Sequence, residues 1–278
     1  MCISQVIRPW DDEKGVHGMK QIFSLAGWNW RLARRAYGIL CGVFALEQLA
    51  VLLFTARRND MLGMGLAACY EEGFQFQVFL LVFLLAGLLA GPAVNDWKRA
   101  KCSYTWLTLP VPPAARLAAQ VLTAAVLELG VVALQLVMYL VYFFPVQAMD
   151  SARAMEKLGA AMPAQSLYEQ VMLSDSLYWL LPRRPTQFVL LAVTLLASAL
   201  LLTCVRLHRG WRRAVAVAIG VVCGVCCLLL FQWEKDFALY SAFDALVHNT
   251  LVSAAVLAIL VVFSIWWALR AIRRAETA

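Results

Sequence analysis

The chain has 278 residues, of which 63% are hydrophobic and only 15% are charged, and its mean hydropathy is +0.73. Soluble domains are nearer half apolar and a quarter charged, so this composition excludes an ordinary soluble protein and predicts one embedded in lipid. The net charge of +7 would suit nucleic-acid binding, but the distribution of the basic residues argues against it.

Residues 1–18 lack the apolar core of a signal peptide, and we interpret them as an upstream extension or a disordered segment. Met19 offers a second translation start, so the sequence leaves open whether translation begins at Met1 or at Met19. Residues 19–36 are amphipathic, with Trp28 and Trp30 suited to the lipid–water interface. This pattern predicts a helix that lies on the inner membrane surface.

Six apolar segments are long enough to cross a bilayer core of about 30 Å, which needs about 20 helical residues. Helices are expected because each segment must satisfy its own backbone hydrogen bonds in lipid. The predicted fold is therefore all-α, with a six-helix transmembrane domain over residues 37–274. The predicted spans are residues 37–56, 74–95, 115–144, 187–206, 213–232 and 250–270.

The basic residues set the predicted orientation. With a cytoplasmic N-terminus, 17 of the 24 lysines and arginines fall on the cytoplasmic side, within residues 8–35, 98–116, 206–213 and 270–274. Because lysine and arginine accumulate on that side, we predict a multi-pass protein of the cell membrane with both termini cytoplasmic. The positive charge then faces lipid headgroups, so the expected partner is the lipid bilayer and not nucleic acid.

Two carboxylates lie near the middle of predicted spans, Glu47 in the first and Glu128 in the third. An ionised carboxylate there costs about 2.5–3.5 kcal/mol on insertion scales, so both side chains should face protein or water. Gln48 neighbours Glu47, and Gln135 shares a helix face with Glu128. These four residues predict a polar pathway for a cationic or amphipathic substrate. A protonated glutamate hydrogen-bonded between helices explains the same pattern equally well.

Two further motifs inside the spans are interpreted as packing. Cys223, Cys226 and Cys227 have metal-ligand spacing but no histidine nearby, so we treat them as small hydrophobic residues and expect no metal site. Gly87 and Gly91 form a small-xxx-small pair, which permits close approach of two helices.

An enzymatic function is disfavoured. Glu71 and Glu72 resemble the paired glutamates of membrane proteases of the CAAX-processing type, but the arginine that such sites need does not follow them. The histidines, none of them in the middle of a span, are His17, His208 and His248. We therefore expect no catalytic residues and no bound cofactor in this chain.

The segment CSYTWLTLPVPPAARLAAQ, residues 102–120, lies in the predicted cytoplasmic connection between spans two and three, residues 97–114. It predicts a short aromatic helix that stops before a proline, because the residue before proline disfavours helical geometry. Pro112 and Pro113 then suit the first turn of the next helix. An ordinary turn with surface aromatic residues is the alternative. The residues of the short element are Tyr104, Trp106, Leu107, Leu109 and Pro110.

This arrangement resembles the ABC-2 type permease family. The resemblance extends over residues 19–274, with an amphipathic N-terminal helix, six spans and a specific motif of about 20 residues. In this chain the motif reads Tyr-x-x-Leu-x-Leu-Pro-Val, followed by a basic residue. The matching positions are Tyr104, Leu107, Leu109, Pro110, Val111, Pro112, Arg116, Leu117 and Gln120.

The resemblance implies the membrane subunit of an ATP-driven exporter for a hydrophobic, amphipathic or peptide substrate. The short element would be a coupling helix seated on a separate ATP-binding subunit, which would carry ATP and Mg²⁺. The pathway would need a second permease half, either an identical or a different chain. Independently, no lysine follows a glycine, so the chain has no phosphate-binding loop of its own.

The alternative function is a non-transporting membrane sensor or assembly scaffold. The predicted extracytoplasmic loop at residues 145–186, about 40 residues long, exceeds what a simple connector needs. In this alternative the loop binds a ligand or a partner.

Overall fold

The structure is a computed structural model, and it describes residues 16–58, 65–90, 111–159, 166–174, 177, 180–181, 185–208, 210–236 and 243–276. This part of the chain is all-helical, which confirms the predicted class. Its eight helices are α1 (Val16–Ala56), α2 (Gly65–Glu72), α3 (Gln75–Leu88), α5 (Pro113–Leu158), α6 (Leu167–Leu173), α8 (Pro185–Leu207), α9 (Trp211–Asp236) and α10 (Phe243–Glu276).

The number of spans differs from the prediction. Within the described residues, four helices are long and apolar enough to cross a membrane, and α2 with α3 would make a fifth if the pair is one span bent by 65°. The prediction of six was wrong in part because the second segment is interrupted by this bend. The segment 213–232 lies within α9, which is not among the four. The four are Met19–Ala56, Pro113–Lys157, Gln187–Leu207 and Ala254–Arg274.

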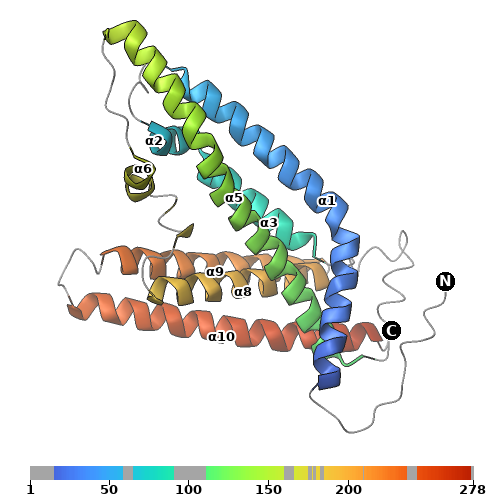
Figure 1. The fold of residues 1–278 in the computed structure, drawn as a ribbon. Coiled ribbons are helices and arrows are strands. Elements are labelled where there is room, and N and C mark those ends of the chain that lie inside the picture. Colours follow the sequence, from blue (N-terminus) through green and yellow to red (C-terminus); the bar gives the residue numbers. More distant parts are fainter. Residues whose placement is uncertain are drawn as a thin grey trace.

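The predicted interfacial helix, residues 19–36, is not a separate element. It continues without a break into the first predicted span, so that α1 is one helix of 41 residues. The sequence of α1 has no proline, and nothing interrupts its backbone hydrogen bonds at the expected boundary. At 1.5 Å per residue α1 is about 60 Å long, twice the thickness of a bilayer core. Its N-terminal turns, dark blue in Figure 1, run at an angle to the rest.

Helix α5 is also longer than predicted. It begins at Pro113, as the proline signal indicated, and Pro112 before it is extended. The helix passes through Pro145 and ends at Gly159, whose φ of 65° suits a glycine helix stop. The predicted span 115–144 is therefore too short, and much of the predicted loop 145–186 is helix. Buried side chains such as Val146 hold the extension against the bundle, which outweighs the hydrogen bond that Pro145 removes.

The helices form two groups, which Figure 1 shows at a steep angle to one another. One group holds α1, α3 and α5, with the short helices α2 and α6 beside them; the other holds α8, α9 and α10 side by side. Helix α5 contacts members of both groups, including α1, α3, α8 and α10. Half of its most apolar stretch is buried, the largest share among the four candidate spans. It is the central helix of the fold.

Two local features define where α6 and α9 begin. Helix α6 begins with a capping box, in which the Ser166 hydroxyl accepts a hydrogen bond from the Glu169 backbone N–H and the Glu169 side chain accepts one from the Ser166 backbone N–H. The accepted hydrogen bond lowers the pKa of Glu169. Helix α9 follows Gly210, whose φ of 56° is accessible to glycine at little cost.

The distribution of side chains is the reverse of a soluble protein. Large apolar residues such as Ile39, Leu46 and Phe54 are exposed along α1, whereas Gln48 and Glu128 are fully buried. In water such exposure would be unfavourable, but lipid tails solvate these side chains, and polar groups in a membrane turn toward the protein interior. The structure is therefore that of a membrane-embedded protein.

Candidate functional site

A buried polar chain crosses the first helix group. The Tyr70 hydroxyl on α2 donates to Oε1 of Gln48 on α1 over 3.0 Å. Nε2 of Gln48 in turn donates to Oε1 of Gln135 on α5 over 2.8 Å. All three side chains are buried. Three helices are thus joined by hydrogen bonds whose partners are far apart in the sequence, in surroundings where an unpaired polar group is costly.

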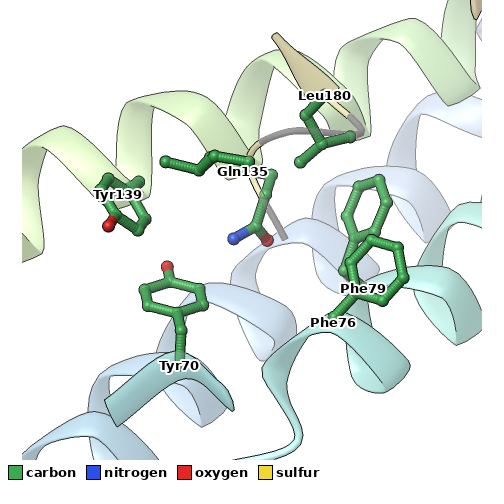
Figure 2. A pocket seen from close by; sticks show the side chains of 7 residues that line it. Tyr70, Phe76, Phe79, Gln135, Tyr139 and Leu180 are labelled. Carbon is green, nitrogen blue, oxygen red and sulfur yellow. The ribbon is translucent and has the colours of Figure 1, made fainter. Parts of the chain in front are cut away.

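A small cavity lies next to this chain. It has a volume of about 10 Å³, enough for about one water molecule. Figure 2 shows Gln135 between the two tyrosines, Tyr70 and Tyr139, on one side and the aromatic rings of α3 on the other. The cavity is too small for a drug-sized or peptide substrate. Its lining residues are Tyr70, Phe76, Phe79, Gln135, Tyr139, Leu177 and Leu180.

The segment that follows α5 supplies two of the lining residues, Leu177 and Leu180, and is held against the bundle. The Tyr139 hydroxyl donates to the backbone carbonyl of Gln170 on α6 over 3.3 Å. The Gln170 side chain accepts from the backbone N–H of Ala67 on α2 over 2.8 Å. Tyr139 also packs its ring on that of Tyr70, with centroids 5.0 Å apart. Helix α6 is therefore anchored to the bundle by buried contacts and is not a freely projecting part of the predicted loop.

Glu47 lies next to the break between α2 and α3. Its Oε1 is 3.4 Å from Nε2 of Gln75, the first residue of α3, and the same nitrogen donates to the Gly73 carbonyl over 3.2 Å. Phe74 between them has a φ of 53°, in the left-handed region, and it lies in the break across which α2 and α3 are bent by 65°. Glu47 thus contacts the discontinuous part of the fold and not the Gln48–Gln135 pair.

Glu128 occupies a third position, where α5 meets α3 and α8. Its Oε2 accepts a hydrogen bond of 2.6 Å from the Ser198 hydroxyl on α8. Its Oε1 lies so close to Gly87 on α3 that a Cβ there would be 2.3 Å away. Ser198 also donates toward its own helix, to the Leu195 carbonyl at 2.9 Å, so the hydroxyl proton is shared between two acceptors. The carboxyl group connects the two helix groups.

The four residues predicted to line a pathway are thus brought together only in part. Gln48 and Gln135 are hydrogen-bonded, whereas Glu47 and Glu128 lie at separate contacts. Glu128 and Gln135 do share the buried side of α5, but they contact different helices. Their substrate role stays a prediction. Sequence reasoning missed the partners Tyr70, Gln75 and Ser198, although Gln75, a polar residue within an apolar run, was a usable signal.

The residues of the predicted coupling element lie outside the described residues. These are Tyr104, Trp106, Leu107, Leu109 and Pro110. The structure describes the segment only from Val111 onward, where Pro112 and Pro113 lead into α5. The coupling role stays a prediction.

The cysteine motif contributes to packing. Cys223, Cys226 and Cys227 are buried free thiols in a cluster with Leu201, Leu230 and Leu257, between α8, α9 and α10. Among the residues that the structure describes, no three histidine, cysteine, aspartate or glutamate side chains are grouped to hold a metal ion.

No protein-family model, curated protein or solved structure matches the chain. Function is therefore inferred from the residues and their packing alone.

Proposed function

We propose that the chain is the membrane subunit of an ATP-driven exporter of the ABC-2 type, with both termini cytoplasmic in the cell membrane. It would move a hydrophobic, amphipathic or peptide substrate outward when coupled to a separate ATP-binding subunit. The observation that carries the proposal is the proline-punctuated segment at residues 102–120, which leads directly into the central helix α5. A movement imposed on that segment would reach both helix groups, because α5 contacts both.

Two features support the proposal. The chain has no phosphate-binding loop, so ATP and Mg²⁺ would be bound by the partner. The buried polar contacts at Gln48–Gln135 and Glu128–Ser198 join helices that alternating access would have to separate or tilt. Since the cavity holds about one water molecule, the substrate pathway would open either in another state or between two permease halves.

The test is stoichiometric assembly. The full chain, affinity-tagged in its native host, should co-purify with an ATP-binding cassette subunit and raise its rate of ATP hydrolysis. Leu107→Asp and Leu109→Asp should abolish both effects, because a charge on an apolar coupling surface is costly to desolvate. Trp211→Asp is the matched control: Trp211 is exposed at the start of α9, on the same predicted face of the membrane.

Assembly that survives the Leu107→Asp and Leu109→Asp changes would contradict the coupling role and favour the sensor or scaffold. So would a purified chain that has no ATP-binding subunit and no effect on ATP hydrolysis. Loss of assembly in the Trp211→Asp control as well would mean that any new charge on this face prevents it, which would also remove the support for a specific coupling element.

A further inference from the structure

At the break between α2 and α3, two side chains in contact with each other each carry an unsatisfied oxygen atom. Gln75, whose side chain is fully buried, directs Nε2 toward Oε1 of Glu47 and the Gly73 carbonyl. Its own Oε1 and Oε2 of Glu47 are both buried and have no hydrogen-bond partner among the residues that the structure describes. Figure 2 shows Tyr70 and Phe76, which lie on either side of the break. Buried acceptors are almost always paired, so two on contacting side chains point to a missing ligand.

The chemistry of these atoms defines the ligand. Both are oxygen acceptors, so they would be satisfied by a positive charge or by a donor. One carboxylate accompanied by neutral oxygens balances a single positive charge, whereas divalent cations generally bring several carboxylates together. The nearby acids are turned elsewhere: Glu71 and Glu72 are exposed, and Glu72 faces Arg58 at 3.7 Å. Hard oxygen ligands favour a hard metal ion.

The surrounding backbone agrees with an ion site. Interrupted helices recur at the ion and substrate sites of membrane proteins, where the freed backbone groups are buried in protein or line a cavity. Here the interruption is enforced by Phe74, held in the left-handed region, and by Gly73, where a Cβ would be 2.9 Å from the Cys69 carbonyl. Glu47 is half-buried, which leaves a way in from the surface.

We propose that Glu47 and Gln75 bind one small monovalent metal ion of the Na⁺ type. The ion lies between Oε2 of Glu47 and Oε1 of Gln75, and it connects α1 to the start of α3. It stabilises the bend between α2 and α3, because the two buried oxygen atoms then have a partner. The site does not depend on export or on an ATP-binding partner, and it can be tested in the purified chain by itself.

The experiment measures the thermal unfolding midpoint of the full chain in detergent micelles. NaCl is compared with choline chloride at equal ionic strength, because choline is too large for the site. We expect Na⁺ to raise the midpoint by at least about 2 °C at saturation. Glu47→Gln should abolish the rise and Gln75→Leu should reduce it. Glu71→Gln, which removes an exposed acid near the same helix break, should retain it.

Binding of ²²Na⁺ to the wild-type chain supplies a second readout that does not require the variants to fold. We expect about one saturable site per chain, displaced by unlabelled NaCl and not by choline chloride. Absence of both saturable binding and the Na⁺-dependent shift would overturn the proposal. An equal loss of the shift in Glu71→Gln would also overturn it, since the effect would belong to surface charge.

Discussion

The backbone of Gly87 on α3 lies against the carboxyl group of Glu128 on α5. A Cβ at position 87 would be 2.3 Å from Oε1 of Glu128 and 2.4 Å from Cδ1 of Leu202 on α8. Three helices therefore meet where one side chain is missing. This close approach encloses the carboxyl group, whose other oxygen accepts the Ser198 hydrogen bond. A glycine predicted to permit packing thus makes room for a polar contact inside the bundle.

Gly87→Ala should destabilise the protein. The added methyl group would have to displace a carboxylate oxygen and a leucine methyl that are both held by packing. Overpacking of this kind costs about 1–3 kcal/mol, opposed by about 1 kcal/mol gained from the better helix propensity of alanine. We expect a clear decrease in the thermal unfolding midpoint in detergent.

Gly42→Ala is the control for that change. Gly42 lies within α1, and no atom is within 4 Å of a Cβ placed there. This variant should be as stable as the wild type or slightly more stable. If Gly87→Ala behaves in the same way, the close contact with Glu128 is not a tight one.

Gln135→Leu should lower the free energy of unfolding by more than the loss of one hydrogen bond suggests. The change leaves Nε2 of Gln48 buried without an acceptor, and an unpaired buried group costs about 1–3 kcal/mol. Gln48→Leu should destabilise the protein to a similar degree, because it also leaves the Tyr70 hydroxyl without its hydrogen-bond acceptor. The double variant should be less destabilised than the sum of the single variants, by about 0.5–2 kcal/mol. A double-mutant cycle of unfolding free energies measures this interaction energy. Strictly additive effects would contradict the hydrogen bond between Gln48 and Gln135.

Phe74→Gly should preserve or raise stability. Phe74 has a φ of 53° and its side chain is 66% exposed, so a left-handed conformation is maintained with little packing in return. Glycine adopts this conformation freely, whereas other residues lose about 1–2 kcal/mol there. The control is Phe54→Gly, at an equally exposed position within the regular helix α1, which should lower stability by about 1 kcal/mol. If Phe74→Gly lowered stability more than Phe54→Gly, the backbone at Phe74 would not be strained.

Stability should decrease in mild acid through His208, just beyond the end of α8. Burial lowers the pKa of His208 below its ordinary value of 6.5, and Arg212 acts in the same direction. The ring lies on Trp267 with centroids 4.0 Å apart, and Nδ1 donates to the Cys204 carbonyl at 2.8 Å.

Because the folded pKa is below the unfolded one, the stabilising contribution is fully present above pH 6.5 and is lost as the pH falls from there through the folded pKa. Unfolding midpoints between pH 7.5 and pH 5 should decrease less in His208→Asn than in the wild type. Equal slopes in the two proteins would exclude His208 as a source of the acid sensitivity.

The pattern of single residues predicted much of the local structure. Proline at 112 and 113 set the start of α5, since proline suits a first helical turn and cannot continue a preceding one. Glu47 and Glu128, isolated in apolar runs, were predicted to face protein, and their contacts with Gln75 and Ser198 agree with that. The boundaries at residue 36 and at Pro145 were wrong, because apolar composition does not reveal where a helix extends beyond the bilayer.

The sequence by itself determined that this protein is helical and membrane-embedded. Each apolar segment has to be solvated by lipid and to satisfy its own backbone hydrogen bonds, whatever its neighbours are. Only the tertiary structure decided which polar residues meet. Gln48 is hydrogen-bonded to Gln135, and Glu47 lies next to the break at Phe74. Glu128 is hydrogen-bonded to Ser198 on α8 and not to Gln135, with which it shares a face of α5. Those partners depend on how helices distant in the chain are packed, and the periodicity of one helix carries no information about the face of another that it will contact.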